Sequence, residues 1–151
     1  MDIFTEICMQ AIQLKKTSPF RFIKRAQISH KIIELEDLLF TKDIYTLSNM
    51  VISFYDNITY NVKAPYDMFI KKSYMKFNLG DKFTVEYNAK RQGFKIREED
   101  YGIYFISEKY TLPPSRIEKW STLEEKIKIL YMKAIADTAY ELAERTIDNN
   151  E

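Results

Sequence analysis

The spacing of apolar residues changes twice along this chain, and that change is the strongest constraint on its fold. Apolar side chains recur at helical spacing up to about residue 55, alternate with polar ones between 57 and 110, and return to helical spacing after residue 121. Short alternating runs at close spacing are typical of antiparallel hairpins rather than βαβ units. The pattern predicts an α+β fold with N-terminal helices, an antiparallel β-meander of four to five strands, and a long C-terminal amphipathic helix packed on the sheet.

Capping residues place the ends of the expected helices. Ser18 is a good N-cap for a second helix, with Pro19 at its first position. Ser121 and Glu124 form a capping box before the last helix, and Trp120 would act as a hydrophobic staple on its first turn. We therefore expect helices over 2–16, from Pro19 to about Leu39, over 41–55, and from Ser121 to about Ile147.

Turn residues divide the middle of the chain into strands. Hairpin turns are expected at 78–81 and 91–93, where Gly80 and Gly93 lie. The strands are expected over 57–63, 69–78, 82–88, 93–98 and 102–110. Pro113 and Pro114 end the sheet. Since no linker, repeat or low-complexity segment interrupts the chain, residues 1–151 are predicted to form a single α+β domain.

The residue inventory argues against several kinds of catalysis. The chain has one His, one Cys and three Gly, which are too few for a histidine-based triad, a multi-cysteine zinc site or a phosphate-binding glycine loop. His30 is expected at a helix surface and Cys8 as a small buried apolar residue. We therefore expect no catalytic residue, metal or cofactor, and a binding protein rather than an enzyme.

A metal-dependent nuclease is a third and more distant hypothesis, because such enzymes need only acids and a lysine. Asp67, Asp81, Glu86 and Lys90 lie on or near the predicted sheet. However, Glu86 and Lys90 are four residues apart, whereas side chains converging from one strand would be two apart. The acidic run 98–100 is better explained as a solvated turn than as a cation site.

Composition also suggests where the protein works. No apolar run approaches the roughly 18 residues that span a bilayer, and the N-terminus is acidic where a signal peptide would be basic. We expect a cytoplasmic protein with no membrane partner. The chain has 19 Ile and 17 Lys against 8 Ala, a skew associated with AT-rich coding sequences. That association suggests a phage or virus, acting in the host cytoplasm, or a low-GC bacterium.

Charge is divided unevenly along the chain. Residues 1–97 hold 16 basic and 10 acidic residues, a net of +6, and residues 98–151 hold 7 basic and 12 acidic, a net of −5. Within 60–97 aromatic residues are interleaved with the cations, as in surfaces that bind single-stranded nucleic acid by phosphate contacts and base stacking. The predicted nucleic-acid-binding residues are Lys63, Lys71, Lys72, Lys76, Lys82, Lys90, Arg91 and Lys95, extended by Arg21, Lys24 and Arg25.

Two other interpretations fit the same pattern. A half-buried sheet places alternate aromatics in its core and alternate lysines in solvent without any ligand. Alternatively, the divided charge would steer a host or viral protein that this chain modulates, or a second copy of the chain. Tyr101, Tyr104 and Tyr110 are the predicted anchors for such a protein partner. The exposure of the aromatics between 60 and 94 distinguishes these hypotheses.

Overall fold

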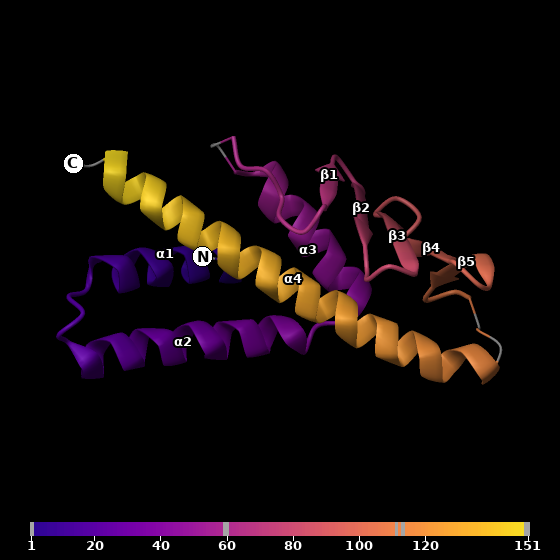
Figure 1. The fold of residues 1–151 in the computed structure, drawn as a ribbon, viewed down its shortest axis with the longest axis horizontal. Helices are drawn as coiled ribbons and strands as arrows, with labels where there is room; N and C mark the ends of the chain where they lie inside the picture. The colour runs from indigo at the N-terminus through magenta and orange to yellow at the C-terminus, as the bar shows by residue number, and fades with distance from the viewer. Residues whose placement is uncertain (1, 59–60, 111, 113, 150–151) are drawn as a thin grey trace. The chain divides into compact units, whose positions relative to one another are not determined.

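The computed structural model describes residues 2–58, 61–110, 112 and 114–149. Within these residues the chain forms four α-helices and five β-strands, in the order α1, α2, α3, β1 to β5 and α4 (Figure 1). Contacts divide the chain into two compact units, residues 1–42 with 132–151 and residues 43–131. We call them the helical unit and the sheet unit. Helix α4 (Pro114–Asn149) contributes residues to both.

The helical unit contains α1 (Ile3–Lys16), α2 (Phe22–Phe40) and the later part of α4. Asp2 caps α1 by accepting a hydrogen bond from the Thr5 backbone N–H at 2.9 Å. The Arg25 guanidinium donates to the carbonyls of Leu14 and Thr17, both at 2.9 Å. Because helix ends leave carbonyls unsatisfied, this side chain of α2 closes the C-terminal end of α1.

The start of α2 differs from the sequence expectation. The Ser18 carbonyl and hydroxyl accept hydrogen bonds from the backbone N–H groups of Arg21 and Phe20, at 3.0 and 3.3 Å. Ser18 therefore forms a turn, and α2 begins at Phe22 instead of Pro19. Apolar residues follow more than one stripe along this helix. The buried stripe consists of Ile28, Ile32, Leu35 and Leu39.

The sheet unit contains α3 (Ile44–Asp56), a five-stranded antiparallel sheet and the first part of α4. The strands run in the order of the chain, which confirms the predicted meander (Figure 1). Asp43 caps α3, accepting from the Thr46 backbone N–H at 2.9 Å. The strands are β1 (Phe69–Lys71), β2 (Tyr74–Asn78), β3 (Phe83–Asn88), β4 (Gly93–Glu98) and β5 (Gly102–Ser107).

One face of the sheet is covered by α3 and α4 and forms the core of this unit. The Tyr87 hydroxyl donates to the Asn49 side chain of α3 at 2.7 Å, and the rings of Phe77 and Tyr131 of α4 meet edge to face at 5.8 Å. Burial raises the pKa of Tyr131, whose hydroxyl lies 2.9 Å from that of Ser48. The long C-terminal helix therefore packs on the sheet, as the sequence predicts.

Three sequence expectations about element bounds are wrong. The predicted strand 69–78 is a hairpin, β1 and β2, whose turn holds Ser73 at φ 62°. The described residues of 57–63 form no strand, and residues 59–60 lie outside the described residues. Helix α4 begins at Pro114, a first position where a missing N–H costs nothing, so Ser121 caps no helix end. Trp120 lies within α4 and its ring contacts that of Phe94 at 5.7 Å.

Candidate nucleic-acid interface

The face of the sheet opposite α3 and α4 carries three of the basic residues predicted from the sequence, Lys71, Lys76 and Lys95, and we call it the outer face. Side chains alternate along a strand, and residues paired across an antiparallel ladder share a face. Because Met75, Tyr87 and Phe94 form a buried row on the inner face, their neighbours in the chain point outward. The outer face thus receives Lys71, Tyr74, Lys76, Thr84, Glu86, Lys95, Arg97 and Phe105.

The centre of the outer face is a row of three charged residues on adjacent strands. Lys76 pairs with Glu86, and Glu86 with Lys95. The two ammonium groups lie 3.8 and 4.0 Å from the carboxylate oxygens, at the outer limit of an ion pair, and both lysine side chains are about half exposed. Such exposed pairs contribute little stability. One carboxylate shared by two cations leaves the row with excess positive charge.

A shallow hollow lies over this row, with a volume of about 220 Å³. Its described lining consists of the polar and charged residues Lys76, Thr84, Glu86, Lys95 and Arg97. Arg97 adds a third cation from β4, two residues beyond Lys95 and hence on the same face. The hollow therefore offers cationic and hydroxyl donors to an anionic group, beside the one carboxylate of Glu86.

Aromatic rings lie at both ends of the outer face. On β1 and β2, the rings of Phe69 and Tyr74 meet edge to face at 6.4 Å, and Phe69 is 55 % exposed. On the β5 side, the Phe105 ring meets that of Tyr110 at 6.1 Å. The Arg91 guanidinium lies over the Phe105 ring, 4.5 Å from its centroid. Stacking groups thus flank the charged row on both sides.

The predicted aromatic residues differ in exposure. Some fit a sheet without a ligand, and others fit a stacking surface for nucleic acid. Phe77, Tyr87 and Phe94 are buried in the core, as expected for a sheet without a ligand. Phe69 and Tyr66 are exposed, while Tyr74 and Phe83 are half-buried, and Tyr60 lies outside the described residues. The stacking surface is therefore smaller than the sequence suggests. Phe105, which the sequence analysis did not select, belongs to it because its cross-strand partner is Lys95.

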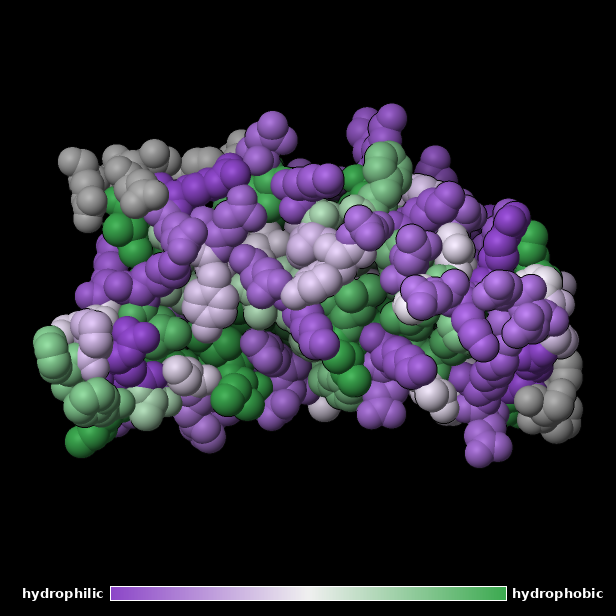
Figure 2. Space-filling model, in the orientation of Figure 1, coloured by the Kyte–Doolittle hydropathy of each residue, from purple (hydrophilic) through white to green (hydrophobic). Residues whose placement is uncertain are grey.

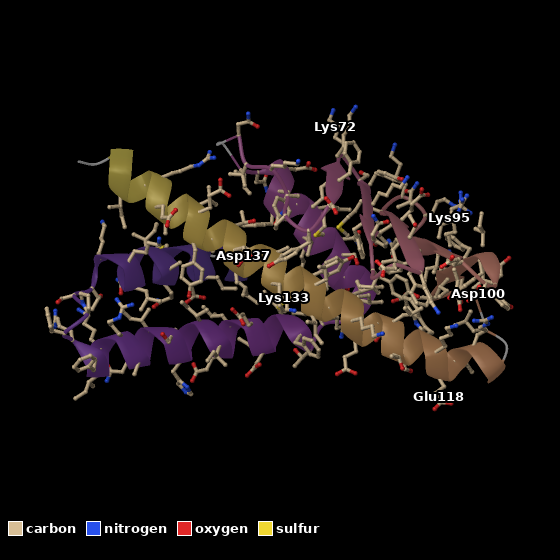
Figure 3. All side chains as sticks on the ribbon, in the orientation of Figure 1. Lys72, Lys95, Asp100, Glu118, Lys133 and Asp137 are labelled. Atoms are coloured by element: carbon tan, nitrogen blue, oxygen red, sulfur yellow. The ribbon has the colours of Figure 1, made fainter. Side chains whose placement is uncertain are left out.

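The remaining predicted cations lie in turns or in the other unit. Lys72 and Lys95 project from the sheet away from α4 (Figure 3). Lys90 and Arg91 lie in the β3–β4 turn at one end of the outer face, and Lys82 lies in the β2–β3 turn. Lys63 is exposed ahead of β1. The predicted extension, Arg21, Lys24 and Arg25, belongs to the helical unit.

Two of the predicted protein anchors, Tyr101 and Tyr104, lie beside a buried carboxylate, and Tyr101 is also 53 % exposed. Glu98 is 7 % exposed and pairs with Lys119 and with Arg116, the latter at 3.0 Å. The Tyr104 hydroxyl donates to Glu98 at 3.4 Å, and the Arg116 guanidinium lies 3.1 Å from the centroid of the Tyr101 ring. Tyr101 and Tyr104 thus have a structural role in joining α4 to the sheet. Tyr110, 64 % exposed, remains accessible beside Phe105.

The same cluster changes the ionisation of Glu98. Burial disfavours its charged form, but hydrogen bonds and charges from Lys119 and Arg116 outweigh that effect and hold the pKa of Glu98 below its ordinary value of 4.5. Its carboxylate faces two cations, while Glu99 and Asp100 are exposed. Among the described residues no group of His, Cys, Asp and Glu side chains is arranged to hold a metal ion.

The single cysteine and the single histidine lie in the helical unit. Burial, with a smaller contribution from the Asp2 charge, raises the pKa of the Cys8 thiol to about 11, so the thiol stays protonated. His30 lies on α2 with its ring 3.1 Å from the Glu34 carboxylate, one helical turn away. No helix in the described part of the chain is long and apolar enough to cross a bilayer.

A comparison of the chain with protein-family models gives no match, and comparisons with curated proteins and with solved structures give none either. The assignment of the candidate interface therefore rests on its geometry and charge.

Proposed function

We propose that this protein binds single-stranded nucleic acid on the outer face of its sheet, without sequence preference, as a non-enzymatic accessory factor. The observation that carries the proposal is the basic hollow over Lys76, Lys95 and Arg97, with a pair of aromatic rings on each side, of which Phe69 and Tyr110 are exposed. Cations that track phosphates and rings that stack with bases are the two components of sequence-independent single-strand binding.

The dimensions of the outer face suit an extended strand. Adjacent β-strands lie about 4.8 Å apart, so Phe69 on β1 and Phe105 on β5 are separated by four spacings, or about 19 Å. The charged row lies midway between them. A single strand crossing the sheet would place its phosphates at the row and a base on each aromatic pair. A duplex would offer no unstacked base to these rings.

Charge reversal on the row tests this proposal. We expect the double variant K76E/K95E to lose at least about tenfold in affinity for a fluorescently labelled single strand, since it replaces attraction with repulsion at two phosphate positions. The matched control K126E/K133E changes net charge equally at exposed positions on α4 and should lower affinity far less.

Fluorescence anisotropy at low and high salt provides the measurement. Wild-type binding should weaken steeply as salt rises, because cations on phosphates release counterions. Equal losses in both double variants, or binding insensitive to salt, would exclude the outer face as the site.

A protein partner is the second candidate function, and one observation favours it. Ile103 on β5, the last strand of the sheet, and Tyr110, three residues after that strand ends, are 52 % and 64 % exposed. Exposed apolar residues on an edge strand are typical of partner surfaces. This candidate predicts that an oligonucleotide does not bind at any salt concentration, whereas the first predicts binding at low salt.

A further inference from the structure

The turn between α1 and α2 carries three large apolar side chains that are almost fully exposed. Phe20, Phe22 and Ile23 are 85 %, 74 % and 78 % exposed. Green apolar side chains gather at this end of the α1–α2 hairpin, next to purple hydrophilic ones (Figure 2). Single exposed apolar residues are ordinary, but a group of this size at one point marks an interaction site. We call residues 20–24 the tip.

Local geometry explains why the tip projects. Side chains in a helix tilt toward its N-terminus, so Phe22 and Ile23, at the start of α2, lean past the end of the helix. Phe20 lies in the preceding turn, which Ser18 holds through its carbonyl and hydroxyl. The core stripe of α2 begins only at Ile28, so the first residues of the helix are not part of it.

The segment that contains the tip is basic in sequence, although one of its lysines, Lys15, pairs with Glu144 of α4. No Asp or Glu occurs between Glu6 and Glu34, a stretch that contains Lys15, Lys16, Arg21, Lys24, Arg25, His30 and Lys31. Lys16, Arg21 and Lys24 are exposed. Cations at the first turn of a helix are unfavourable for the helix dipole. Apolar and basic residues of the tip line one open hollow of about 480 Å³. Its lining consists of Phe20, Arg21, Phe22, Ile23, Lys24 and Gln27.

We propose that the tip binds the surface of an anionic phospholipid bilayer. Phe20, Phe22 and Ile23 would enter the boundary between headgroups and acyl chains, and Arg21 and Lys24 would contact the phosphates and carboxylates of the headgroups. Interleaved apolar and basic residues on a projecting turn, in a stretch of sequence without acids, complement a bilayer, which is apolar inside and anionic outside. The sequence expectation of no membrane partner rested on the lack of spanning runs, and a peripheral contact needs none.

Vesicle co-sedimentation of the full chain tests the proposal. We expect the protein to sediment with vesicles of phosphatidylcholine and phosphatidylserine, and at least about tenfold less with phosphatidylcholine alone. The variant F20S/F22S should lose at least about tenfold in affinity for the anionic vesicles, because each phenylalanine buries apolar area on binding. R21E/K24E should lose a similar factor and the salt dependence with it.

The matched control is I33S/L38S, which removes two apolar side chains of α2 that are about half exposed. Ile33 lies eleven residues after Phe22, about 16 Å along the helix axis, and should not reach the bilayer. This control should bind anionic vesicles like the wild type. A loss equal to that of F20S/F22S would indicate docking along the helix and would overturn the proposal.

Other outcomes also decide against the bilayer. Equal binding to neutral and anionic vesicles, or no binding to either, would overturn it. Sedimentation velocity showing a dimer that F20S/F22S abolishes, without vesicle binding, would assign the tip to a second copy of the chain. The sheet variant K76E/K95E should bind vesicles normally, so failure of the nucleic-acid proposal and failure of this one are distinguishable.

Discussion

At the scale of single residues, Glu98 is the polar group on which the sheet unit depends most. Its carboxylate is nearly buried at the end of β4 and contacts Arg116 and Lys119 on α4. Removing one partner of a buried pair leaves the other charge without compensation. The sequence shows Glu98 only as the first of three consecutive acids. Its separate role depends on α4 beginning at Pro114, which places both cations opposite it.

Replacing Glu98 with Gln should lower the free energy of unfolding by roughly 1–3 kcal/mol, since a charged partner of two cations is lost. Urea unfolding at pH 7 measures it. The neighbouring change Glu99→Gln, at an exposed position, is the control and should remain within about 0.5 kcal/mol.

The contacts of Glu98 with Arg116 and Lys119 also make the free energy of unfolding depend on pH. Because the pKa of Glu98 is lowered in the folded protein, its contribution is complete above the ordinary value of 4.5 and is lost as pH falls through the folded pKa. The difference between wild type and Glu98→Gln should therefore shrink below about pH 4.5. A difference that stays constant down to pH 3 would contradict this role of the carboxylate.

At the scale of elements, sequence patterns predicted the type and order of most helices and strands but not all of their ends. The strands predicted over 82–88 and 93–98 correspond to β3 and β4. The run 69–78 has no glycine or proline, so the turn at Lys72 and Ser73 had no sequence signal, and Ser73 itself adopts the left-handed region. Gly93 was expected both in the turn at 91–93 and at the start of the strand 93–98. It lies in β4, where a Cβ would come within 2.2 Å of the Phe105 ring.

Gly93→Ala tests this close approach. The added methyl group would overlap the Phe105 ring and lie 2.9 Å from the Ile106 carbonyl, so we expect a loss of roughly 1–3 kcal/mol. In a Phe105→Ala background the loss should be smaller, because the nearest obstacle is gone. Thermal unfolding of the wild type, the two single variants and the double variant gives the coupling free energy between positions 93 and 105. Equal losses in both backgrounds would show that Phe105 does not restrict the residue at 93.

At the scale of the whole molecule, the chain has two compact units, each with its own cationic surface. The sequence predicted the net charge of +6 over residues 1–97, but not that these cations belong to two units. Arg21 and Lys24 accompany exposed apolar residues in the helical unit, whereas Lys76, Lys95 and Arg97 surround a polar hollow in the sheet unit. The spacing of apolar residues could not identify either cationic surface. It does not show which of two possible apolar stripes is buried by the fold and which stays exposed.

The affinity of Glu86→Gln for a labelled single strand tests the central claim most directly. Glu86 is the acid at the centre of the outer face, so removing its charge should tighten binding by about threefold at low salt. A damaged fold would not raise the affinity for the strand. The direction of the change in affinity therefore decides the test. Tighter binding by Glu86→Gln than by wild type is the predicted result, and unchanged or weaker binding would contradict the assignment of the outer face to nucleic acid.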